Sequence, residues 1–250
     1  LAQAALATGC RSVAFTYNDP TIFLEYAVDV AKACHAVGVK TVAVTAGYIC
    51  PEPRAEFYSH MDAANVDLKG FTQDFYKRLC SGDLDDVLAT LKYIHHETTV
   101  WLEVTTLLIP GQNDGDQELT ELSAWFAGEL GPDVPLHFTA FHPDYKMTDI
   151  ARTPHQTLLR ARDIAKAAGL SNVYVGNVHD ADAGSTYCSG CGAKLIGRDW
   201  YRLGEWNLDG SGHCTQCGLK CPGVFDGPPG DWGQKRVPVN MKRFTAQISR

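Results

Sequence analysis

The 250-residue sequence contains no continuous apolar run of the ~18 to 20 residues that a membrane-spanning helix needs. It also has no excess of basic residues, since 22 lysines and arginines stand against 29 aspartates and glutamates, for a formal net charge of −7. A surface that neutralises nucleic-acid phosphates needs the opposite balance. We therefore expect neither a membrane span nor a nucleic-acid partner.

A disulfide framework is likewise not indicated. The nine cysteines are odd in number, and five of them fall between Cys188 and Cys221. This clustering favours a metal site in a reducing compartment, which we expect to be cytoplasmic. The other four have no mutual spacing typical of metal ligands: Cys10, Cys34, Cys50 and Cys80. Cys34 falls on an apolar helix face, so we expect it in the core.

Strand-like and helical segments alternate regularly along the chain. The strand-like runs are 12–17, 41–45, 64–68, 99–108, 136–140 and 172–175. Because helical patterns separate them, the sequence predicts right-handed βαβ units and a parallel sheet. We expect one α/β domain over 1–180, a short linker, a small module over 186–224 and an extended tail over 225–250, in which Trp232 stands among polar residues.

One helix is predicted at both of its ends. Thr153 and Gln156 have the spacing of a capping box, and Pro154 would occupy the first helical position. Gly169 follows the last turn, where a glycine commonly ends a helix. The apolar positions between these signals, such as Leu158, predict a helix that packs on a sheet.

Polar residues gather where the predicted strands end. They are Asn18, Asp19, Thr45, Asp67, Lys69, Glu103, Thr105, Thr106, His137, His142, Asn177 and His179. In parallel α/β barrels the carboxyl ends of the strands form the active face, although polar residues can also simply mark exits into solvent. Asp67 and Lys69 favour the first interpretation, because strand alternation puts both charges on one face, where they need partners.

The strongest local signal is a pair of Cys-x-x-Cys motifs, Cys188–Cys191 and Cys214–Cys217, each followed by a glycine. Two such turns form a tetrahedral four-sulfur site, the usual arrangement of structural zinc. The segment between them predicts a hairpin across 195–208. Two disulfides are the less favoured alternative. An iron–sulfur triplet that includes Cys221 is also less favoured, because the second motif is already paired with the first.

Several longer motifs resemble those of one enzyme family. They are Tyr-Asn-Asp-Pro-Thr-Ile-Phe at 17–23, Asn-Val-Asp-Leu-Lys-Gly at 65–70, Ile-Pro-Gly-Gln-Asn-Asp at 109–114, Phe-His-Pro-Asp-Tyr-Lys-Met at 141–147, Tyr-Val-Gly-Asn-Val at 174–178 and the closing cysteine motifs. With these the chain resembles the radical S-adenosylmethionine enzyme of the AmmeMemoRadiSam system, which is related to the pyruvate formate-lyase activating enzymes. The resemblance implies a partial (β/α)6 barrel that carries a [4Fe–4S] cluster, binds S-adenosylmethionine and has protein partners of the same system.

The resemblance also implies which residues bind the cofactor: Asn18, Asp19, Thr45, Asp67, Lys69, His137 and His142. Asp19 corresponds to the carboxylate near the methionine ammonium, although most relatives have the longer glutamate there. Asp67 and Lys69 correspond to a strand that contacts the ribose and carboxylate side. After Thr45, Ala46 replaces an asparagine that is common in relatives. The two histidines correspond to positions on the substrate side, and no residue is assigned as catalytic.

One family motif is missing from the sequence. The Cys-x3-Cys-x2-Cys triplet that holds the cluster occurs nowhere in the 250 residues. Because Leu1–Gly9 has the pattern of a helix without its start, we expect the first strand and the three cluster ligands to precede this chain. The intact protein would then cleave S-adenosylmethionine to a 5′-deoxyadenosyl radical, whereas these residues alone would be inactive. No electron donor is implied.

Two other interpretations stay open from the sequence. The first is a closed eight-stranded aldolase- or isomerase-like barrel, with Lys69 as a Schiff-base amine or Asp67 as a base. The second is a zinc-ribbon module that docks a partner protein on such a scaffold. Lys194, Arg198 and Arg202 near the cysteines are too few to make that module a nucleic-acid binder.

Overall fold

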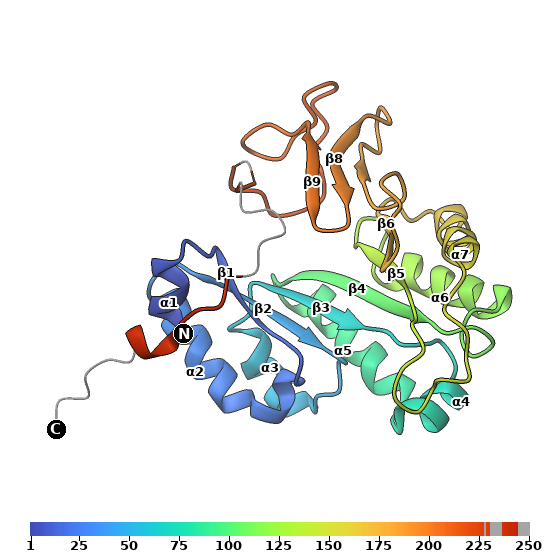
Figure 1. Cartoon of the computed structure of the whole chain (residues 1–250), viewed down its shortest axis with the longest axis horizontal. Helices are drawn as coiled ribbons and strands as arrows, with labels where there is room; N and C mark the ends of the chain where they lie inside the picture. The colour runs from blue at the N-terminus through green and yellow to red at the C-terminus, as the bar shows by residue number, and fades with distance from the viewer. Residues whose placement is uncertain (228, 231–236, 245–250) are drawn as a thin grey trace.

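The protein is described by a computed structural model, which covers residues 1–227, 229–230 and 237–244 (Figure 1). The predicted tail over 225–250 therefore falls partly outside the described residues, and Trp232 falls wholly outside them. Within the described residues, no helix is long and apolar enough to cross a membrane.

Helices and strands alternate through the first 176 residues. The strands are β1 Ser12–Phe15, β2 Lys40–Thr45, β3 Ala63–Asp67, β4 Trp101–Leu108, β5 Leu136–Ala140 and β6 Val173–Gly176. The helical segments are α1 Ala2–Ala7, η1 Pro20–Phe23, α2 Leu24–His35, α3 Pro51–Tyr58, α4 Gln73–Phe75, η2 Tyr76–Cys80, α5 Leu84–Glu97, α6 Asp116–Glu129 and α7 His155–Ala167. The six predicted strands are confirmed, with boundaries that differ by at most two residues.

The large sheet is parallel, and its strand order is the chain order, β1-β2-β3-β4-β5-β6 (Figure 1). The register sets Thr45 beside Val66, Asp67 beside Thr105, and Thr105 beside His137. Among the described residues β1 and β6 are the two edges of a six-stranded sheet. The closed eight-stranded barrel is therefore not what this part of the chain forms, whereas a partial barrel is consistent with it.

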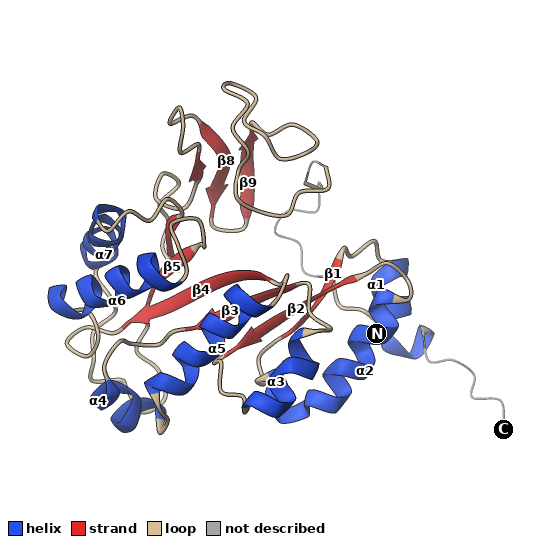
Figure 2. Ribbon diagram, turned by 180° about the vertical axis from the view of Figure 1, so that it is seen from behind, coloured by secondary structure: helices blue, strands red, loops and turns tan. Residues whose placement is uncertain are grey.

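Alternation along the strands divides the sheet into two faces. Leu102, Val104 and Leu108 of β4 are buried in the main core, and α2, α3, α5 and α6 cover that face (Figure 2). Glu103 and Thr105 point to the opposite side and are only half-buried. We call this second side the inner face. It lacks a helical layer in the described chain, so the side chains on it are available for chemistry.

The start of α7 differs from the prediction. The helix begins at His155 with Pro154 as its N-cap, and no side chain caps it. The Thr153 hydroxyl instead donates to the Leu108 carbonyl and accepts from the Phe141 N–H at 2.8 Å. The predicted capping box is therefore wrong, because the hydroxyl joins the ends of β4 and β5. The predicted end is confirmed by Gly169, whose φ is +98°.

A second, antiparallel sheet follows the linker. It consists of β7 Thr186–Tyr187, β8 Lys194–Asp199 and β9 Arg202–Trp206, in the order β7-β8-β9. The predicted hairpin is confirmed by the pairing of β8 with β9. Figure 1 shows this C-terminal module (residues 186–224) above the large sheet, with the turn between β8 and β9 at the end nearest to the sheet. A last 3-10 turn, η3, covers Met241–Arg243.

Candidate functional site

Asp19 lies at the carboxyl edge of the sheet, between the ends of β1 and β2. Its Oδ1 accepts hydrogen bonds from the Thr21 backbone N–H at 3.0 Å and the Thr21 hydroxyl at 2.8 Å. The Thr45 hydroxyl lies 3.0 Å from both carboxylate oxygens, and the Ala46 N–H donates to Oδ2 at 2.7 Å. The structure thus brings Asp19 and Thr45 together. Because these donors take up most of the carboxylate's lone pairs, its visible role is to cap η1 and fix the end of β2.

Asp67 and Lys69 form an ion pair at the end of β3. Lys69 Nζ lies 2.7 Å from Asp67 Oδ2, and the two side chains keep 41% and 35% of their surface exposed. Val66 and Leu68, which point the other way, are fully buried. The predicted alternation is therefore confirmed. The pair faces solvent on the inner side of the sheet, so a ligand can reach both charges.

Asn113 fixes the backbone under this pair. It is 2% exposed, and its side-chain nitrogen donates to the Lys69 carbonyl at 2.6 Å and the Leu107 carbonyl at 2.9 Å. Its side-chain oxygen accepts from the Ile109 N–H at 2.7 Å. Sequence reasoning quoted the 109–114 motif without giving Asn113 a role. Its place in the turn that follows the end of β4 was the available signal.

His137 lies two strands away from Asp67 and has a different partner. Its Nε2 is 2.8 Å from Glu103 Oε2, and its ring stacks on Tyr174 with centroids 5.0 Å apart. Burial by itself raises the pKa of Glu103. The hydrogen bond and charge of His137 and the 3.0 Å hydrogen bond from the Trp101 indole lower that pKa by more, so it lies below its ordinary value. The structure thus places His137 in a Glu–His pair rather than beside the ion pair of β3.

The other two predicted residues, Asn18 and His142, are exposed in the loops that follow β1 and β5. Asn18 comes directly after Tyr17, which has a φ of +71° and is 95% exposed. A left-handed tyrosine of this kind is uncommon. Neither residue contributes a described contact to the Asp67–Lys69 pair.

The four predicted metal ligands converge in the C-terminal module. Cys188, Cys191, Cys214 and Cys217 have sulfurs that all lie within 4.8 Å of one another, with 3.5 Å between Cys188 and Cys217 and 3.8 Å between Cys191 and Cys214. Four sulfurs at about 2.3 Å from one zinc ion would be about 3.8 Å apart. All nine cysteines are free thiols, and Cys221 is buried outside this group.

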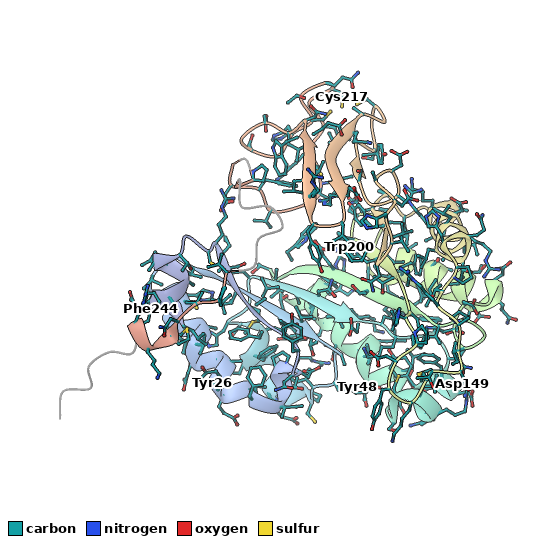
Figure 3. All side chains as sticks on the ribbon, in the orientation of Figure 1. Tyr26, Tyr48, Asp149, Trp200, Cys217 and Phe244 are labelled. Carbon is teal, nitrogen blue, oxygen red and sulfur yellow. The ribbon has the colours of Figure 1, made fainter. Side chains whose placement is uncertain are left out.

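The two cysteine turns have the same backbone geometry. Gly192 and Gly218 have φ values of +75° and +77°, and each donates its N–H to the carbonyl of the first cysteine of its motif. The Cys191 backbone N–H points at Cys188 and lowers the pKa of that thiol. For Cys217 a backbone N–H also lowers the pKa, but the hydrogen bonds of the neighbouring thiols raise it by more. The four sulfurs are thus close enough to share protons, as the ligands of one ion would be. Figure 3 places Cys217 at the far end of the module from the large sheet.

The first half of the chain is similar to a known family. Residues 1–123 match the model of the radical SAM superfamily. This segment is similar to the radical SAM superfamily, and it contains β1 to β4 together with the Asp67–Lys69 pair.

Individual proteins are also similar to this chain. The chain is 39% identical over 221 residues to an uncharacterized protein of Methanocaldococcus jannaschii, with 88% of this chain and 65% of that protein covered. Among solved structures, a domain of a pyruvate-formate lyase-activating enzyme from Bacteroides vulgatus has a TM-score of 0.57 at 18% identity, covering 66% of this chain and 98% of that one. A radical SAM methyltransferase from Sphaerobacter thermophilus has a TM-score of 0.58 at 17% identity, covering 70% of this chain and 54% of that one. These two likenesses concern the fold.

Proposed function

We propose that these residues form the S-adenosylmethionine-binding part of a radical S-adenosylmethionine enzyme. The observation that supports this is the half-exposed Asp67–Lys69 pair on the inner face, inside the segment that is similar to the radical SAM superfamily. The methionine part of the cofactor carries one ammonium and one carboxylate, which are complementary to this carboxylate and this ammonium. Bound there, S-adenosylmethionine would supply the radical chemistry of the superfamily, while the protein residues hold and orient it.

The residues do not fit the iron–sulfur cluster that the superfamily uses with this cofactor. The sequence has no Cys-x3-Cys-x2-Cys triplet. Among the described residues, the four-cysteine group of the C-terminal module is the one group of histidines, cysteines or carboxylates that converges as metal ligands do. We therefore derive no step through a cluster, and the proposal for this chain concerns binding and orientation of S-adenosylmethionine.

The finer identity follows from the motifs. We propose that the protein is the radical enzyme of the AmmeMemoRadiSam system and that it activates or modifies a protein partner of that system. The motifs at 17–23, 65–70 and 141–147 support this assignment. We also propose that the four cysteines bind zinc in a structural role, because four protein ligands leave no coordination position for water or substrate.

Removal of either member of the ion pair tests the cofactor proposal. Lys69→Ala and Asp67→Ala should each weaken binding of S-adenosylmethionine to the purified chain by roughly ten- to a hundredfold, since a charge-assisted hydrogen bond contributes ~1.5 to 3 kcal/mol. Isothermal titration calorimetry measures the affinity, and thermal melts of the same samples report stability.

A matched control is the Lys77–Asp83 pair, which is also 2.7 Å long and exposed. Lys77→Ala removes the same charge from the same region of the chain and should leave the affinity unchanged. Failure of the unmodified chain to bind would contradict the proposal. Unchanged affinity in Lys69→Ala with a large fall in melting temperature would show a structural ion pair instead.

A further inference from the structure

A cavity of about 830 Å³ lies between the inner face of the large sheet and the C-terminal module. Ala63, Trp101 and Tyr174 line it from the sheet, and Arg198 and Trp200 line it from the module. Figure 3 shows Trp200 at the end of the module that faces the sheet. The volume falls in the range of small-molecule sites, roughly 300 to 1,000 Å³. The Asp67–Lys69 pair is not among the lining residues, so this is a second place on the inner face.

Arg198 differs from the other charged groups of the cavity wall. Its Nη1 donates to the Thr186 hydroxyl at 2.6 Å, and its guanidinium carbon lies 5.6 Å from the centre of the Tyr174 ring. Within the described residues it forms no ion pair with a carboxylate, so part of its planar set of five donors remains for a ligand. Such a fork binds carboxylates, sulfonates and phosphates.

The remaining charged groups of the wall are already paired with one another. The pairs, with their shortest distances, are Arg11–Asp226 at 3.1 Å, Lys40–Asp62 at 3.8 Å, His137–Glu103 at 2.8 Å and His155–Asp180 at 2.8 Å. In the last pair only Asp180 lines the cavity. Arg198 is therefore the cation of the wall without a described ion pair, although its charge lies close enough to Glu103 to help lower the pKa of that carboxyl group. The guanidinium donors that no carboxylate occupies can bind an anionic group of a ligand.

Trp200 occupies a costly position in the turn between β8 and β9. Its φ is +55°, a left-handed conformation that hairpin turns usually give to Gly, Asn or Asp. The side chain nevertheless keeps 45% of its surface exposed, and its ring stacks on His179 with centroids 5.1 Å apart. Folding of the module does not need an aromatic residue here, because a glycine would fit the turn with less strain. The large ring at the cavity wall is instead suited to contact with a ligand ring.

We propose that this cavity binds a small aromatic anion, whose charged group pairs with Arg198 and whose ring packs against Trp200 and Trp101. The site is built jointly by the inner face and the C-terminal module. It does not depend on binding of S-adenosylmethionine at the carboxyl edge, so each site can be tested without the other.

Two fluorescent probes of similar shape test the proposal. The sulfonate 8-anilinonaphthalene-1-sulfonate is the aromatic anion, and N-phenyl-1-naphthylamine is its neutral counterpart. In fluorescence titrations of the full 250-residue chain, Arg198→Gln should weaken binding of the sulfonate by about tenfold and leave the neutral probe within about twofold. Trp200→Gly should weaken both probes, although it relieves the strained turn. Ala63→Trp, which fills the cavity from the sheet side, should abolish both.

Arg202→Gln is the matched control, since Arg202 is exposed on the same hairpin and does not line the cavity. It should leave both affinities unchanged. Equal weakening of both probes by Arg198→Gln would show that Arg198 only clamps the module to the sheet, and it would overturn the anion site. Sulfonate binding that persists in Ala63→Trp would place the probe elsewhere and overturn the cavity as the site. Absence of sulfonate binding by the unmodified chain would overturn the proposal as a whole.

Discussion

Asn113 holds two strand ends together through one buried amide. Asn113→Ala would leave the Ile109 N–H and the carbonyls of Lys69 and Leu107 without their partner. Because an unsatisfied buried polar group costs about 1 to 3 kcal/mol, we expect the free energy of unfolding to fall by at least this amount, as measured by urea denaturation. Gln112→Ala, next to it in the loop, should change stability by less than about 0.5 kcal/mol. Similar losses in the two variants would contradict this role.

Single residues could be predicted from the sequence where a local rule decides their position. Strand alternation was enough to place Asp67 and Lys69 on one face, because it depends only on the chain around them. The partners of Asp19 and His137 come from other strands, 26 and 34 residues away in the sequence. No periodicity carries that information. His137 was therefore expected near the cofactor residues, whereas its ring pairs with Glu103.

Helices and strands were likewise predictable where the local sequence determines them, and not where a distant residue does. The six strands were predictable because buried, mostly apolar residues recur at alternate positions along them, a pattern that depends only on the local sequence. The capping box at the start of α7 failed because the Thr153 hydroxyl has a competing partner, the Leu108 carbonyl at the end of β4. A side chain that fits a local capping pattern can thus form its hydrogen bond with a strand end 45 residues earlier in the chain instead.

The C-terminal module is the element that the proposed zinc ion would stabilise. We expect metal analysis of the purified chain to give about one zinc ion per chain, and Cys188→Ser to give almost none, since structural zinc sites lose their metal with a ligand. Heteronuclear NMR should then show loss of the β7–β9 resonances, while the large sheet stays folded. Cys10→Ser, which changes an exposed cysteine outside the site, should keep the zinc. Two intact disulfides without zinc would refute the expectation.

For the whole molecule, three histidine–carboxylate pairs link stability to pH. They are Asp62 with His35, Glu103 with His137, and Asp180 with His155. Burial raises the pKa of each carboxyl group, but hydrogen bonds from backbone N–H groups or from the histidine rings lower it more, so all three pKa values lie below the ordinary range. The folded protein therefore binds fewer protons than the unfolded chain just below the ordinary carboxyl pKa of ~4.

The resulting stability is present above about pH 4 to 5 and is lost as the pH falls through the lowered values. We expect the free energy of unfolding, measured in urea between pH 6 and pH 3, to fall steeply at the acid end. Asp180→Asn should reduce that slope, because the side chain is only 15% exposed and its titration is then removed. Glu25→Gln, on the surface of α2, should leave that slope unchanged. A slope equal to that of the unmodified protein in Asp180→Asn would contradict the assignment.

The sequential strand order also bears on how the chain reaches this shape. Since every strand of the large sheet pairs with its predecessor, no strand has to wait for a later segment before it finds a neighbour. A nascent chain can add one βαβ unit after another as it leaves the ribosome, so synthesis and assembly run in the same direction. The cysteine module follows β6 in the chain, so it meets a sheet whose six strands have already been made. The cavity between the sheet and the module can therefore form only after both have been synthesised.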